Sequence, residues 1–177
     1  HLHVPLQHGC DSVLRRMGRW YTTAVFREQV ESLKARIPLL GLGTDLIAGF
    51  PGESEEEFNG GRDFVSSLPF TYFHVFPYSP RPGTVAASLP GRIDTALARE
   101  RVRVLRSVSS DKNASFRKAL NGQSLPVLLE TVLPDGTLAC RADNYVRVYC
   151  NPPAADEIFR LRVTRLWQDG VWGEKEL

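Results

Sequence analysis

Hydrophobic residues follow a helical spacing in the segment that begins after Thr22 and Thr23. They recur at every third or fourth position and so form one apolar face. These positions are Phe26, Val30, Leu33 and Ile37. Pro38 follows directly and cannot continue a helix. The pattern therefore predicts a core helix that ends before Pro38.

Three shorter apolar segments have the character of β-strands, because each is bounded by residues that favour turns. They are residues 1–7, 42–48 and 72–77. A helix is expected after each strand. Asp11 is expected to cap a helix after the first strand, Ser54 opens a capping box with Glu57 after the second, and residues 94–120 form a long helix after the third.

This alternation of strands and helices is typical of βαβ units with parallel strands. We therefore predict an α/β fold, a partial parallel βα barrel of about three βα units. The functional loops of such folds lie at the carboxyl ends of the strands. Those ends are residues 7–9, 49–53 and 77–83.

The rhythm changes to short strands after Gly122, with turns at residues 134–136 and 169–170. The expected strands are residues 125–131, 137–142, 145–149 and 158–166. They predict a small antiparallel β-barrel. We therefore expect two domains, residues 1–121 and residues 122–177.

Composition places the chain among ordinary globular proteins, since 42% of its 177 residues are hydrophobic and 24% are charged. No apolar run reaches the roughly 18 to 20 residues of a membrane-spanning helix, which predicts no membrane partner. The net charge is +4 in residues 1–121 and −2 in residues 122–177. This asymmetry permits contact with a polyanion but does not by itself indicate nucleic-acid binding.

The three cysteines, Cys10, Cys140 and Cys150, are odd in number and scattered, so they predict neither a disulfide framework nor a metal knuckle. A reducing compartment, the cytoplasm, is expected. The chain begins at His1 with no signal peptide, and we interpret it as a piece of a longer protein.

Candidate site residues gather at two of the predicted strand ends. Gly49 and Gly52 flank a strand end and permit close approach of a ligand, or they simply form a tight turn. Asp45 lies in an apolar strand, where a carboxylate needs partners. It serves a buried site or forms a structural salt bridge with an arginine such as Arg19. Gln7 has an amide suited to hydroxyl or carboxylate groups, unless it is an exposed loop residue.

Arginine and aromatic side chains are the candidates for anion and nucleic-acid contact. Arg19 suits a carboxylate, although a surface arginine is the plainer interpretation. Tyr78 and Arg81, in a long loop, are suited to stacking on a base or holding a phosphate, unless the loop is only a proline-stiffened lid. Arg160 and Arg162 alternate along one strand and form either an RNA-binding face or a solvated one.

The histidines do not predict a metal site from their spacing. Strand alternation puts only His1 and His3 on one face, without a third ligand at coordinating distance. His74, in an apolar strand, is expected to be a core histidine. We therefore predict no bound metal.

Four segments, in order, resemble the radical S-adenosylmethionine methylthiotransferases: residues 1–9 (HLHVPLQHG), 17–22 (MGRWYT), 44–53 (TDLIAGFPGE) and 74–84 (HVFPYSPRPGT). The first and last are most similar to the branch that modifies threonylcarbamoyladenosine beside the tRNA anticodon. The segment after Gly122, with DNYVRV at 143–148, is similar to the RNA-binding TRAM domain of these enzymes.

The resemblance implies a C-terminal part of such an enzyme, with S-adenosylmethionine and tRNA as partners. It implies that Gln7, Arg19, Asp45 and Gly49 border the cofactor and that Ile47 and Phe50 contact its adenine. The family also binds 4Fe-4S clusters through a CxxxCxxC motif and three further cysteines. The three cysteines here have neither spacing, so we expect this chain to bind no cluster, to hold no cofactor tightly and to be inactive alone.

Two alternatives remain open. One is another radical enzyme of the superfamily, similar to the coproporphyrinogen-type proteins, which lack a TRAM domain. The other is a non-catalytic RNA-binding module. An incomplete barrel would also have an open edge and an uncovered inner face, expected to contain Val4, Leu46 and Val75, so self-association through that edge is expected.

Overall fold

The computed structural model describes residues 1–151 and 157–175 and divides the chain into two units. One unit consists of residues 2–38 and 42–112, and the other of residue 1, residues 39–41 and residues 113–177. The predicted domain boundary after residue 121 stays a prediction. In the described part of the chain, no helix is both long enough and apolar enough to cross a membrane.

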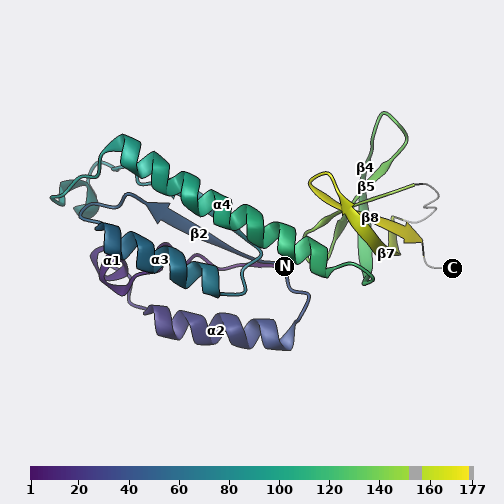
Figure 1. Cartoon of the computed structure of the whole chain (residues 1–177), viewed down its shortest axis with the longest axis horizontal. Helices are drawn as coiled ribbons and strands as arrows, with labels where there is room; N and C mark the ends of the chain where they lie inside the picture. The colour runs from purple at the N-terminus through teal and green to yellow at the C-terminus, as the bar shows by residue number, and fades with distance from the viewer. Residues whose placement is uncertain (152–156, 176–177) are drawn as a thin grey trace. The chain divides into compact units, whose positions relative to one another are not determined.

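The first unit is built on a parallel sheet with strand order β1-β2-β3. The central strand β2 is labelled in Figure 1. The strands are β1 (Leu2–His3), β2 (Leu42–Ala48) and β3 (Tyr72–Pro77). The predicted α/β fold with parallel βα units is confirmed. The first strand is shorter than predicted because Pro5 lacks an N–H, and pairing resumes only as an isolated bridge between Gln7 and Leu46.

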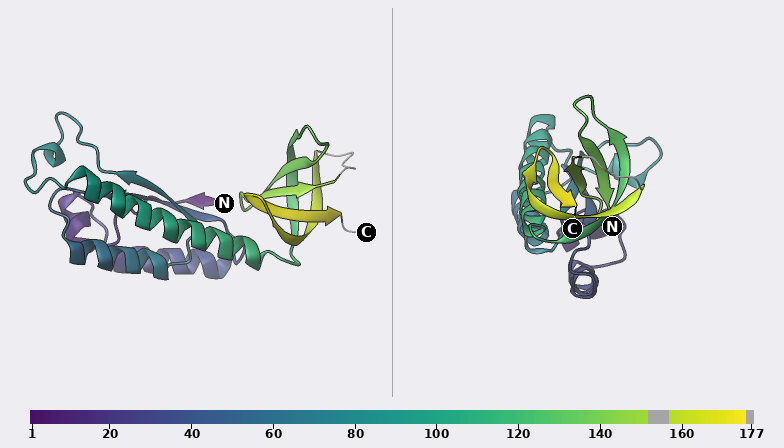
Figure 2. Two further views of the ribbon diagram at one scale, coloured as in Figure 1. Left: turned by 45° about the horizontal axis from the view of Figure 1, so that its top comes forward. Right: turned by 90° about the vertical axis from the view of Figure 1, so that its right-hand side faces the viewer.

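Helices cover one face of this sheet (Figure 2). They are α1 (Asp11–Arg16), α2 (Thr23–Arg36), α3 (Glu55–Ser67) and α4 (Thr95–Ala119), with a short 3₁₀ helix, η1 (Val85–Ser88), in the long loop. The capping box of Ser54 and Glu57 is confirmed. The cap expected at Asp11 is wrong, since Cys10 is the N-cap of α1 and the Asp11 carboxylate accepts the N–H of Thr23 (2.7 Å) at the start of α2.

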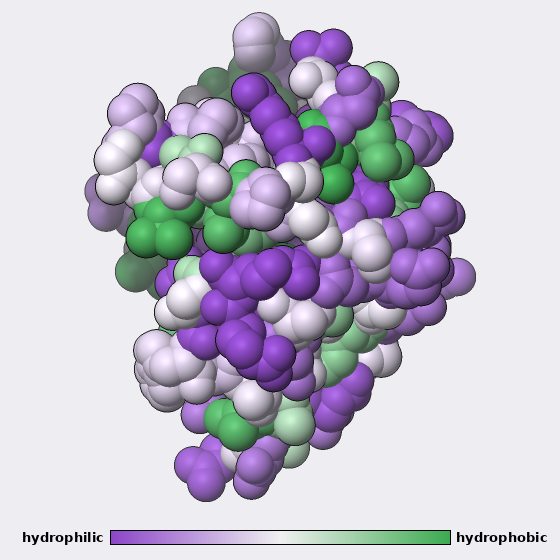
Figure 3. Space-filling view, turned by 90° about the vertical axis from the view of Figure 1, so that its left-hand side faces the viewer, coloured by the Kyte–Doolittle hydropathy of each residue, from purple (hydrophilic) through white to green (hydrophobic). Residues whose placement is uncertain are grey.

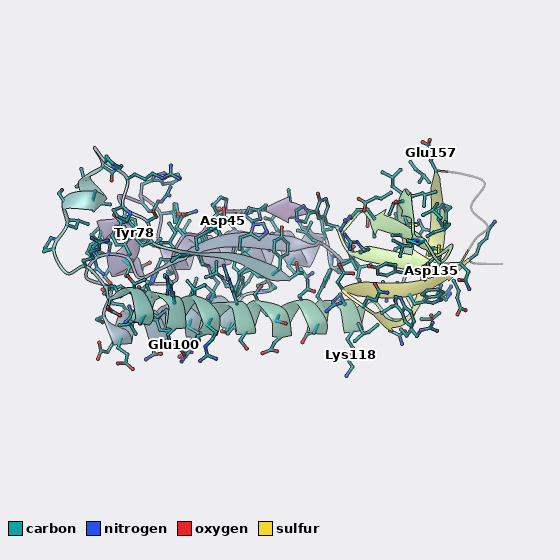
Figure 4. All side chains as sticks on the ribbon, turned by 90° about the horizontal axis from the view of Figure 1, so that it is seen from above. Asp45, Tyr78, Glu100, Lys118, Asp135 and Glu157 are labelled. Carbon is teal, nitrogen blue, oxygen red and sulfur yellow. The ribbon has the colours of Figure 1, made fainter. Side chains whose placement is uncertain are left out.

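The two faces of the sheet differ in burial because side chains alternate along each strand. Asp45 lies on the side of the sheet away from α4 (Figure 4). Its neighbour Leu46 is 2% exposed and, with Val75 at 4%, packs on the helix side. The expectation that Leu46 and Val75 line the inner face is therefore wrong, because the strand register assigns that face to the alternate positions, among them Asp45, Ile47 and His74.

The second unit contains a closed five-stranded barrel with the order β4-β5-β6-β8-β7. The strands are β4 (Ser124–Val132), β5 (Leu138–Ala142), β6 (Arg147–Cys150), β7 (Ile158–Trp167) and β8 (Gly170–Lys175). The small barrel is confirmed, but it is mixed rather than antiparallel, since β6 and β8 pair in parallel. Strand β8 escaped prediction because glycines interrupt its pattern. A Cβ at Gly173 would lie 2.9 Å from that of Leu161, so this glycine permits close packing of β8 on β7.

Candidate functional site

A cavity of about 660 Å³ lies at the carboxyl ends of the parallel strands. Four of the residues predicted to border a cofactor line it together, namely Gln7, Arg19, Asp45 and Ile47. The long loop after β3 contributes Tyr78, Ser79, Arg81 and Thr84. The volume lies within the range of small-molecule sites. Seen from the end toward which β2 points, the surface carries interspersed hydrophilic and hydrophobic residues (Figure 3).

Gln7 enters the cavity from a strained backbone. Its φ is +73°, in the left-handed region that residues with a Cβ rarely adopt. Two main-chain hydrogen bonds hold it there: its N–H donates to the carbonyl of Asp45 (2.8 Å), and its carbonyl accepts the N–H of Ile47 (2.8 Å). The sheet therefore maintains a conformation of a kind that is common at binding sites.

Arg19 follows a sharp corner after α1. Gly18 has φ +71°, and the N–H of Arg19 donates to the carbonyl of Leu14 (2.9 Å). Within the described residues the Arg19 guanidinium has no acidic partner, so it remains available to an anionic group in the cavity. The alternative of a structural Arg19–Asp45 salt bridge is wrong.

Asp45 is instead bordered by two histidines from the neighbouring strands. Its Oδ1 lies 2.9 Å from Nε2 of His3 and 3.5 Å from Nδ1 of His74. The expectation of a core histidine is wrong for His74, whose side chain is 57% exposed because position 74 points to the open face. Register across strands, rather than spacing along the chain, produces this cluster.

The turn at residues 49–53 is held by the buried carboxylate of Glu53, which is not among the residues predicted from the sequence. Glu53 is 2% exposed and accepts the N–H of Gly49 (2.5 Å). Its Oε2 also lies 3.0 Å from Nη1 of Arg101, which is 4% exposed. A charged residue on the apolar face of α4, between Ala98 and Val102, was the available signal, because a buried arginine requires a partner.

His8 completes this network as a neutral side chain. Its Nδ1 accepts the backbone N–H of Cys10 (3.1 Å), so the proton resides on Nε2, which donates to Oε1 of Glu53 (3.0 Å). The position is 5% exposed. His8 therefore links the loop after β1 to the turn after β2.

Gly49 and Phe50 lie behind the cavity rather than on its wall. Gly49 has φ +79°, and a Cβ there would approach that of Ala98 to 2.7 Å. Phe50 is 3% exposed and packs edge-on against Tyr78, with ring centroids 5.1 Å apart. The Tyr78 hydroxyl is buried, and among the described residues it has no hydrogen-bond partner. A buried hydroxyl at a cavity wall can be satisfied by water or by a bound ligand in the cavity.

The cavity fits S-adenosylmethionine by its chemistry. Arg19 suits the methionyl carboxylate, Gln7 suits polar groups that both donate and accept, and Ile47 offers an apolar surface to a base. The cysteines do not fit an iron–sulfur cluster. Cys140 and Cys150 are buried in the barrel, where a hydrogen bond with Cys150 and burial raise the pKa of the Cys140 thiol.

The residues predicted to contact RNA are distributed over both units. Tyr78 and Arg81 line the cavity, whereas Arg160 and Arg162 lie on the exposed face of β7. Arg160 donates to the hydroxyl and the carbonyl of Ser124 (3.1 and 3.0 Å), and Arg162 donates to the carbonyl of Gly122 (2.9 Å). These contacts orient both side chains along the outer surface of the barrel.

Comparisons with known proteins return tRNA methylthiotransferases. No protein-family model matches the chain. The chain is 34% identical over 171 residues, 97% of its length, to threonylcarbamoyladenosine tRNA methylthiotransferase MtaB of Thermotoga maritima, and 36% identical over 84% of its length to the MtaB of Bacillus subtilis. It is 41% identical over 73% of its length to tRNA-2-methylthio-N(6)-dimethylallyladenosine synthase of Moorella thermoacetica. The chain spans 39%, 34% and 29% of the lengths of these three relatives. On this evidence, and with its match to their C-terminal region, the chain belongs to the tRNA methylthiotransferase family.

Proposed function

We propose that this chain is the part of a radical S-adenosylmethionine methylthiotransferase that supplies one wall of the cofactor pocket and a surface for tRNA. The proposed substrate is threonylcarbamoyladenosine next to the anticodon. The observation that carries the proposal is the convergence of Gln7, Arg19, Asp45 and Ile47 on one cavity at the ends of the parallel strands. Similarity to MtaB over nearly the whole chain supports the choice of substrate.

In the complete enzyme, S-adenosylmethionine would supply the methyl group and, with a 4Fe-4S cluster held elsewhere, the radical. The role of this chain is to bind and orient. Arg19 would bind the carboxylate of the cofactor, and Gln7 would fix its polar groups from a backbone that the sheet holds rigid. Ile47 and, through Tyr78, the buried Phe50 would form the apolar side of the adenine site.

The barrel would bind the tRNA backbone through Arg160 and Arg162, and Tyr78 and Arg81 would meet the nucleotide at the cavity. A surface of this kind binds phosphate without reading sequence. The proposal includes a cytoplasmic location, where tRNA is modified. The coproporphyrinogen-type alternative is disfavoured because the relatives reported above carry tRNA methylthiotransferase names.

Self-association is a further part of the proposal, but β3 does not offer an unprotected edge. The N–H of Phe73 donates to Oγ of Ser109 (2.7 Å), Nη2 of Arg106 donates to the carbonyl of Val75 (3.1 Å), and Pro77 has no N–H. The edge at which a second strand would pair is therefore that of β1.

Deletion of the intact gene, followed by mass analysis of tRNA nucleosides, tests the proposed function. The expected result is loss of the methylthio derivative of threonylcarbamoyladenosine. Loss of the methylthio derivative of isopentenyladenosine instead would overturn the choice of substrate, and an unchanged nucleoside profile would overturn the enzymatic role.

A further inference from the structure

Three potential metal ligands meet on the open face of the sheet, each from a different strand. His3 comes from β1, Asp45 from β2 and His74 from β3, and their ligand atoms all lie within 4.8 Å of one another. Parallel register places Asp45 directly beside His74. The three positions are held by paired backbone rather than by a loop, so the arrangement is fixed by the sheet itself.

We propose that His3, Asp45 and His74 form a binding site for a divalent transition-metal ion such as Zn²⁺. Two imidazoles and one carboxylate are a common ligand set for ions of this class. Ligand atoms around a tetrahedral zinc ion lie roughly 3.3 Å apart, given metal–ligand distances of about 2.0–2.2 Å. The observed separations from Oδ1 of Asp45, 2.9 Å to His3 and 3.5 Å to His74, are close to this value.

The surroundings of the cluster favour a cation over a purely structural contact. In the described part of the chain, the ion-pair partners of Asp45 are both histidines, and neither lysine nor arginine neutralises its carboxylate. Nδ1 of His3 lies 3.2 Å from the hydroxyl of Tyr72. With Nε2 on the metal, Nδ1–H would donate to this hydroxyl, the outer hydrogen bond that typically orients a metal-binding histidine.

The site is also accessible to solvent. With three protein ligands it would leave coordination positions open, as catalytic metal sites do and structural metal sites do not. The side chains of His3, Asp45 and His74 are 27%, 28% and 57% exposed. Asp45 also lines the large cavity, so the remaining coordination positions would face a ligand or water there. This inference does not depend on the proposed tRNA chemistry.

Isothermal titration calorimetry of the tag-free 177-residue chain with Zn²⁺ alone tests the proposal. We expect one ion per chain at micromolar or tighter affinity, and a loss of about tenfold or more in Asp45→Asn and in His74→Gln. Because an N-terminal His-Leu-His sequence can itself chelate metals, His1→Ala is the matched control and should bind as the unmodified chain does. Binding that is lost in His1→Ala but retained in His74→Gln, or no binding by the unmodified chain, would overturn the proposal.

The absorption spectrum of the Co²⁺ complex provides a second readout that does not depend on variants. A site of two imidazoles and one carboxylate should give visible bands without intense near-ultraviolet sulfur-to-metal absorption. Strong sulfur-to-metal absorption would assign the ion to Cys10 or the barrel cysteines and overturn the proposal. Circular dichroism should show that Asp45→Asn and His74→Gln remain folded, since these two side chains lie on the open face of the sheet.

Discussion

Glu53 and Arg101 form an ion pair in which both side chains are buried, with 0% and 5% exposure and a nitrogen–oxygen distance of 3.0 Å. Nη1 of Arg101 donates in addition to the backbone carbonyl of Glu53 (3.0 Å). The pair joins α4 to the turn that follows β2. Because the same carboxylate holds Gly49, the position of the turn behind the cavity depends on a residue 48 positions away in the chain.

Arg101→Leu should destabilise the chain by about 3–5 kcal/mol, because it leaves the buried Glu53 carboxylate without its cation. Urea unfolding monitored by circular dichroism measures the change in unfolding free energy. Arg103→Leu is the matched control, since Arg103 lies on the same helix with a side chain 77% exposed, and it should have little effect. Equal effects of the two substitutions would contradict the structural role given to the Glu53–Arg101 pair.

Gly49→Ala should cost roughly 2–4 kcal/mol, because the residue needs φ +79° and the new methyl group would meet Ala98 at 2.7 Å. Gly60→Ala is the control. Gly60 lies within α3, has open space where a Cβ would be, and should gain about 0.5–1 kcal/mol from helix propensity. Thermal unfolding of both variants checks the prediction, and a neutral Gly49→Ala would contradict it.

The Arg16–Glu57 pair predicts a specific pH dependence. A hydrogen bond from Arg16, aided by those from Ser12 and the Ser54 N–H, lowers the pKa of Glu57 from 4.5 to about 2. A lowered folded-state pKa means that this stabilisation is complete above about pH 4.5 and is lost as the pH falls toward 2. Glu57→Gln should therefore destabilise the chain by roughly 1–3 kcal/mol at pH 7 and much less near pH 2.5.

The unfolding free energies of Glu57→Gln and of the unmodified chain, measured from pH 7 to pH 2.5, give the difference. Glu55→Gln, at an exposed position of the same first helical turn, is the control, and its effect should be small. A difference between Glu57→Gln and the unmodified chain that stays constant from pH 7 to pH 2.5 would show that Glu57 is not held in its charged form.

Arg160→Gln combined with Arg162→Gln should weaken tRNA binding and reduce the slope of log affinity against log salt by roughly 1.5–2. Both side chains lie on the outer face of β7, so the barrel should remain folded. The control removes the same charge from α4, with Arg99→Gln and Arg103→Gln. An unchanged salt slope in the β7 variant would show that another surface carries the phosphate contacts.

Local patterns were sufficient to predict most elements. Helix α2 with its buried residues Phe26 and Val30, and the capping box of α3, depend on neighbouring residues and could be identified without tertiary information. Ile37 was wrongly expected on the apolar face, since it follows the last residue of α2 and is 48% exposed. The cavity residue Gln7 was predictable because parallel strands end at one edge of the sheet, and Asp45 was predictable because a carboxylate in an apolar strand needs partners. The left-handed backbone of Gln7 was not predictable, since it arises from bonds to a strand about 40 residues away.

The parts that escaped prediction depend on strand register and on long-range contacts. The cluster of His3, Asp45 and His74 exists only because three strands pair in one register. Burial of Glu53 depends on Arg101, a helix residue far along the chain. No spacing rule along one segment contains that information.

Quantification of tRNA nucleosides in a deletion strain that carries the intact gene with Arg19→Gln tests the central claim most directly. Arg19 lines the cavity without an acidic partner among the described residues, so its loss should remove binding of the cofactor carboxylate while the fold is retained. The account predicts that the unmodified gene and an Arg103→Gln control restore the methylthio derivative of threonylcarbamoyladenosine, and that Arg19→Gln yields about tenfold less or lower. Full restoration by Arg19→Gln would contradict it.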